Sequence, residues 1–117
     1  MPTKHFISLQ NASELTARFK KMKTEVLADG YKEILCNCET FDREAFDKVL
    51  AKDGCTGIRI YFGMDAINQL RLVVVGVNAQ DQDMISSQTS SLTEDDDIFD
   101  NGRRCPDECP PDSPLNS

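Results

Sequence analysis

The sequence lacks the side chains on which the common catalytic sites depend. Its 117 residues contain one histidine, His5, so neither a Ser-His-Asp triad nor a Cys-His pair has support. No G-x-G-x-x-G or Walker-type loop occurs, which excludes the usual phosphate-binding motifs. The pairs Asp81/Asp83 and Asp95/Asp97 match no EF-hand loop, so we expect these carboxylates to lie in solvated acidic runs. Any enzymatic function would therefore rest on the cysteines.

Long hydrophobic runs are also missing. The longest, Leu72 to Val77, is far shorter than the roughly 20 apolar residues that a membrane span requires. The first 15 residues have no apolar stretch of the kind found in secretory signals. We therefore expect a soluble, cytoplasmic protein with no membrane partner.

Positive charge is scarce. The chain has 13 lysines and arginines against 20 aspartates and glutamates, a net charge of −7. Most of the excess lies in Thr93–Ser117, where eight acidic residues meet two arginines. Because nucleic-acid binding requires a basic surface, this balance argues against a nucleic-acid partner and favours a basic protein surface as the partner. One basic cluster exists, and its helical spacing is typical of a solvated helix face: Arg18, Lys20, Lys21 and Lys23.

Apolar spacing predicts two helices. One covers residues 9–26, where apolar side chains recur every three or four positions, and Ser8 or Asn11 is expected to cap its start. The other covers residues 43–52, with Asp42 as its cap. Gly30 is a candidate stop for the first helix, and Glu33–Cys38 between the two helices is predicted to be a strand.

Two strongly β-patterned runs follow, joined by a short polar turn. In the first run Ile58, Ile60 and Phe62 share one face, while Arg59 and Tyr61 share the other. The loop from Met64 to Gln69 has a length typical of a hairpin, and Asp65 is expected to accept hydrogen bonds within it.

The second run, Leu70–Val77, is apolar on both faces, so something must cover Val73 and Val75. The tail, a sheet that curls, or a second subunit could do so. A homodimer through this face would use Tyr61, Val73 and Val75 as its interface residues, because an exposed β-branched patch is costly in water.

These elements predict an α+β fold. We expect two helices packed on one face of a small, mainly antiparallel sheet, in two layers, formed by residues 1–80. Residues 81–117 are expected to form an acidic linker rich in Ser, Asp and Pro, followed by an extended tail that carries cysteines. Ile98 and Phe99 are the bulky apolar pair of this segment and a candidate docking anchor.

The five cysteines are the best chemical lead and allow three interpretations. They are Cys36, Cys38, Cys55, Cys105 and Cys109. In the first, the thiols are unrelated: the first three are small core or strand residues, and the tail pair is exposed to solvent. In the second, Cys55, Cys105 and Cys109 contribute to a zinc site that clamps the tail to the sheet, although C-x-x-x-C is less typical of zinc sites than C-x-x-C. In the third, a disulfide closes the tail onto Cys55 or onto itself, against which a reducing cytosol counts.

Much of the chain resembles a group of small uncharacterised bacterial proteins. Their common features are a G-C-x-x-I-R-I-Y-x-G-M-D strand, an L-V-V-V-G-V strand and a C-P-x-x-C-P end, which correspond here to Gly54–Asp65, Leu72–Val77 and Cys105–Pro110. The resemblance implies that Cys55 and the tail cysteines belong to one recurring design. It transfers no catalytic residue.

The leading functional hypothesis is a non-enzymatic protein-binding or regulatory module. The alternative is a zinc-binding or thiol-redox protein that uses Cys55, Cys105 and Cys109. A further alternative is a structural homodimer through the sheet face.

Overall fold

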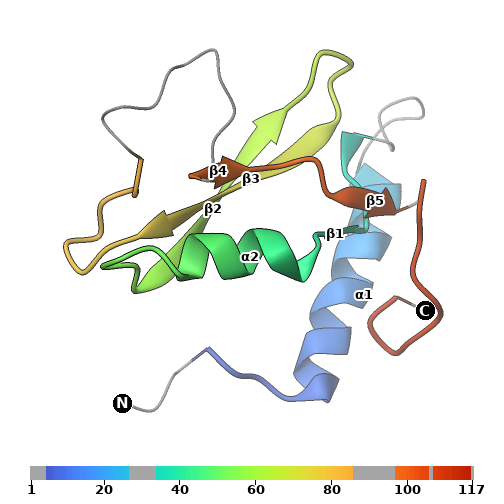
Figure 1. The fold of residues 1–117 in the computed structure, drawn as a ribbon. Helices are drawn as coiled ribbons and strands as arrows, with labels where there is room; N and C mark the ends of the chain where they lie inside the picture. Colours follow the sequence, from blue (N-terminus) through green and yellow to red (C-terminus); the bar gives the residue numbers. More distant parts are fainter. Residues whose placement is uncertain (1–4, 27–33, 86–96, 106, 117) are drawn as a thin grey trace.

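The computed structural model describes residues 5–26, 34–85, 97–105 and 107–116 (Figure 1). In chain order the elements are α1 (Leu9–Val26), β1 (Cys38–Thr40), α2 (Arg43–Leu50), β2 (Gly57–Met64), β3 (Leu70–Val77), β4 (Ile98–Phe99) and β5 (Arg103–Cys105). The strands form two antiparallel sheets, one ordered β2-β3-β4 and the other β1-β5. The predicted α+β class, with its antiparallel pairing, is confirmed.

The first helix begins where one of its two candidate caps predicts. The Ser8 hydroxyl accepts a hydrogen bond from the backbone N–H of Asn11 at 3.0 Å, so Ser8 and not Asn11 caps α1. The helix continues to Val26, and its predicted stop at Gly30 lies outside the described residues. No residue of α1 is buried, although the helix carries the predicted apolar stripe.

The predicted strand at Glu33–Cys38 is wrong for residues 34–37, while Glu33 lies outside the described residues. The strand instead begins at Cys38, because β1 forms only where β5 lies opposite it. The N–H of Asn37 still bonds the carbonyl of Cys105 at 2.9 Å. β5 ends at Cys105, and the Glu108 N–H donates a 2.7 Å hydrogen bond to the Arg104 carbonyl.

The hairpin forms as predicted. Its register runs from Gly57 opposite Val77 to Met64 opposite Leu70. Asp65 accepts hydrogen bonds from the N–H groups of Ile67 and Gln69, at 3.0 and 2.9 Å, and pairs with Arg71 at 3.2 Å. These N–H donors, that of Gln69 first, lower the pKa of the Asp65 carboxyl, which confirms this residue as the turn acceptor.

The core lies between α2 and the three-stranded sheet (Figure 1). Val49 of α2 and Val74 of β3 are fully buried. Phe99 of β4 stacks edge-on against Phe41 and Phe46, with ring centroids 5.3 and 4.9 Å apart. Of the predicted anchor pair, Phe99 thus packs against the core while Ile98 stays exposed, and β4 and β5 both come from residues beyond 80.

The expected side-chain cap of α2 does not form. Asp42 precedes α2 as expected but makes no side-chain cap, because its carboxylate pairs with Arg103 of β5 at 3.1 Å.

In the described part of the chain, no helix is both long and apolar enough to cross a membrane.

Candidate functional site

The sheet face opposite α2 carries a polar clamp, formed by Arg59, Tyr61, Asp81 and Asp83. Arg59 lies opposite Val75, and directly opposed residues share a face. Asp83 bridges to Val77 on the other edge of β3. The Asp83 carboxylate accepts a bond from the Arg59 guanidinium at 2.5 Å and one from the Tyr61 hydroxyl at 2.5 Å. Both long side chains therefore reach across β3.

This clamp supplies the cover that the doubly apolar strand requires. Val75 is only 2% exposed, with Arg59 opposite it on β2 and Ile98 opposite it on β4. Of the three predicted interface residues, Val75 is buried inside its own chain and Val73 is half-buried. Tyr61 remains exposed. A second subunit is therefore not needed to bury Val75.

The electrostatics of the clamp are those of a charge-assisted network. The pKa of the Asp83 carboxyl is lowered, first by the Tyr61 hydroxyl and then by Arg59. The same hydrogen bond raises the pKa of Tyr61, and Asp83 raises that of Arg59. Asp81 adds a 2.6 Å bond to the guanidinium. The Asp81 and Asp83 carboxylates are thus engaged with an arginine.

The tail cysteines form a disulfide between Cys105 and Cys109. This confirms the third interpretation in the form that closes the tail onto itself. Cys55 lies elsewhere, beside Val49 and Gly76, and its thiol donates to the Gly57 carbonyl at 3.3 Å. The described residues include no group of three or more His, Cys, Asp or Glu side chains arranged to hold a metal. The zinc site stays a prediction.

Sequence reasoning did not predict that two cysteines lie opposite each other in a β-ladder. Cys38 of β1 lies directly opposite Cys105 of β5. Both Cys38 and the buried Cys36 are free thiols, so four of the five cysteines belong to the β1–β5 ribbon or the chain adjoining it. The C-x-C spacing was visible in the sequence, but the register that places Cys38 against the tail was not.

A polar pocket of about 290 Å³ adjoins the disulfide loop. Its lining comes from the end of the hairpin and from the tail: Arg71, Asn101, Gly102, Arg103, Arg104, Asp107 and Glu108. One of these lining residues, Arg104, has its guanidinium 3.8 Å from the Glu39 carboxylate, and both side chains are nearly inaccessible to solvent. Burial raises the pKa of Glu39, an effect that the charges of Arg71 and Arg104 oppose.

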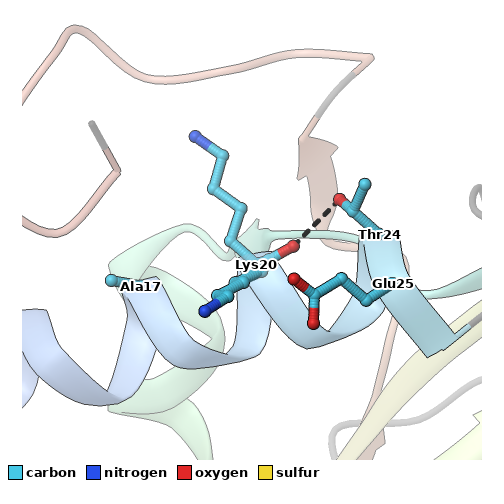
Figure 2. A pocket seen from close by; sticks show the side chains of 5 residues that line it. Ala17, Lys20, Thr24 and Glu25 are labelled. Atoms are coloured by element: carbon cyan, nitrogen blue, oxygen red, sulfur yellow. Dashed lines mark hydrogen bonds between the residues drawn. The ribbon is translucent and has the colours of Figure 1, made fainter.

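A second hollow, of about 390 Å³, lies along α1 (Figure 2). Only this helix lines it, through Ala17, Lys20, Lys21, Thr24 and Glu25. The one hydrogen bond drawn there is local, from the Thr24 hydroxyl to the Lys20 carbonyl at 3.1 Å (Figure 2). A hollow on one helix does not enclose a ligand, so we assign it no binding role.

Exposed apolar side chains gather on two elements. On β2 they are Ile60, Tyr61, Phe62 and Met64, and on α1 they are Leu9, Leu15, Phe19, Met22 and Val26. β2 is also an edge strand of its sheet, since the order is β2-β3-β4, and it is the longer of the two edge strands. Within the described residues no strand pairs with its outer edge.

Comparison of the chain with models of protein families, with curated proteins and with solved structures finds no match.

Proposed function

We propose that this chain is a non-enzymatic protein-binding module that pairs with a second copy of itself through the outer edge of β2. The observation that carries the proposal is an eight-residue edge strand with no partner among the described residues. Such an edge presents unpaired backbone N–H and C=O groups and accepts another strand readily.

The side chains of β2 support this proposal. Phe62 is 78% exposed, and Ile60, Tyr61 and Met64 are each at least 46% exposed. Natural sheets protect an edge with short strands, prolines or charged side chains. β2 is long, and its sequence GIRIYFGM contains no proline.

The charge distribution on β2 favours a second copy of the chain as the partner of this edge. The only charge on β2 is Arg59, and Asp81 and Asp83 already bind it. Two β2 edges can therefore approach without a like-charge pair between them, even though each chain carries −7. An antiparallel pair of identical strands is self-complementary about a twofold axis, which closes the assembly at two copies. A basic partner protein remains a prediction from the net charge.

The test is the mass of the protein in solution, measured by sedimentation equilibrium over a dilution series. We expect wild-type protein to reach twice the 13.1 kDa of one chain. We expect Phe62→Lys to lower the association constant by about tenfold or more, because a lysine on an edge strand opposes pairing. Phe6→Lys is the matched control, since Phe6 is 87% exposed and lies outside β2.

Two results would overturn the proposal. One is a single-chain mass for wild-type protein at every concentration. The other is equal association of wild type and Phe62→Lys while circular dichroism shows both folded. Non-reducing denaturing electrophoresis removes the remaining ambiguity, because it shows whether any dimer is held by an intermolecular disulfide.

A further inference from the structure

We propose that Cys38 is the attacking thiol of an intramolecular exchange that opens the Cys105–Cys109 disulfide. This goes beyond the proposed protein-binding function and rests on a different part of the fold. Its basis is the β1–β5 register, in which Cys38, a free cysteine, lies directly opposite Cys105 of the disulfide.

The geometry of the ladder suits a bond between these residues. Directly opposite residues of antiparallel strands have Cα atoms about 4.5 to 5.5 Å apart, inside the range of about 4.4 to 6.8 Å that disulfides span. Opposite residues also direct their side chains to the same face. Cys105 can therefore bond either to Cys109 or to Cys38 without a change in the register of β1 and β5.

Burial selects which sulfur each nucleophile can reach. Cys105 is 6% exposed, so thiols in solvent have little access to it. Cys109 is exposed, and Cys38 is half-buried at the edge of the ribbon. Attack on Cys105 is thus open to the neighbouring strand, while Cys109 is placed as the leaving group.

The step is balanced within the chain. The Cys38 thiol loses its proton to water, and the thiolate attacks the Cys105 sulfur. The Cys38–Cys105 bond forms as the Cys105–Cys109 bond breaks, and the Cys109 thiolate leaves and takes up a proton. One disulfide and three free thiols exist before and after, so no external oxidant or reductant is consumed.

The exchange would change what the tail presents. While Cys109 is bonded to Cys105, the segment 105–109 is a closed loop. After exchange this loop is open and Cys109 is an exposed thiol, able to form a mixed disulfide with a partner thiol. The two disulfide isomers would thus differ in the freedom and reactivity of the C-terminal segment.

Peptide mapping tests the exchange directly. Trypsin cuts after Lys32, Arg43 and Arg104, so one peptide holds Cys36 and Cys38 and another holds Cys105 and Cys109. Wild-type protein is incubated at about pH 8, where thiolate forms, then acidified, alkylated and digested without reductant. We expect a measurable population in which the two peptides are linked, with an equal amount of alkylated Cys109.

Variants identify the residues involved. The linked pair should fall about tenfold or more in Cys38→Ser, while Cys36→Ser and Cys55→Ser should keep it. In Cys109→Ser, oxidised glutathione should produce the Cys38–Cys105 bond. Circular dichroism confirms that each variant is folded. The proposal fails if Cys38→Ser retains the link, or if folded Cys109→Ser forms no bond between Cys38 and Cys105.

Discussion

The Asp83 carboxylate accepts hydrogen bonds from two side chains of β2. Asp83 bridges to β3 from the other side, so these side chains reach it across β3. Both the Tyr61 hydroxyl and the Arg59 guanidinium favour the ionised carboxylate, so the pKa of Asp83 in the folded protein is below its ordinary value. The unfolded chain therefore binds a proton at a higher pH than the folded chain does. The stabilisation is complete above the ordinary pKa of 3.8 and is lost as the pH falls through the lowered value.

We accordingly expect Asp83→Asn to destabilise the protein at neutral pH. The difference from wild type should begin to shrink below about pH 4, where the unfolded wild-type chain takes up the proton, and vanish once the folded carboxylate is protonated as well. Urea unfolding at about pH 7 and about pH 3 measures this. Asp112→Asn, at an exposed position in the tail, is the control and should change little at either pH. A penalty for Asp83→Asn that is equal at both pH values would show that the clamp acts by packing alone.

At the scale of elements, α2 packs closely against β3 at Gly76. A Cβ at Gly76 would lie 3.0 Å from the Cys55 sulfur and 3.0 Å from a methyl carbon of Val49. We expect Gly76→Ala to destabilise the protein by about 1 to 3 kcal/mol, measured by urea unfolding, because a well-packed core resists added volume.

Val49→Ala tests whether that cost comes from the α2 contact. Alone it should also destabilise, because it leaves a cavity at a fully buried position. Combined with Gly76→Ala it should cost less than the sum of the two single changes, because each substitution relieves the other. Strict additivity would place the cost of Gly76→Ala at the other close contact, the Cys55 sulfur, instead.

Some of these elements could be predicted from the sequence and others could not. Hairpin arms, helix α1 and the Asp65 turn follow from local patterns of apolar residues and turn chemistry. β1, β4 and β5 contain only two or three residues each, too few for a periodicity, and exist because a partner lies opposite them. For the candidate sites, the shared face of Arg59 and Tyr61 was predictable. Their common acceptor Asp83 and the Cys38–Cys105 register were not, because both depend on pairing between distant segments.

At the scale of the whole molecule, the described tail segment 97–105 belongs to the fold, because it supplies β4 and β5. Phe99 completes an aromatic cluster with Phe41 and Phe46. The Asp97 carboxylate forms an ion pair with the Lys52 ammonium group at 2.6 Å. We expect deletion of residues 97–117 to abolish cooperative unfolding, because it uncovers Val74 and leaves these rings unpacked. Deletion of 110–117 alone should preserve a cooperative transition. The check is thermal unfolding followed by near-UV circular dichroism, and a sharp transition in the longer deletion would contradict the expectation.

The pairing of β1 with β5 also has a consequence for the order of folding. These strands come from opposite halves of the chain, so forming the ladder from Cys38–Cys105 to Thr40–Arg103 requires closing a very long loop. The β2–β3 hairpin needs only a short turn and can form on a microsecond scale of about 1 to 10 μs. During synthesis the hairpin can therefore be in place before β5 leaves the ribosome. In that interval Cys38 has no opposite strand, and the oxidation that joins Cys105 to Cys109 requires only the last part of the chain.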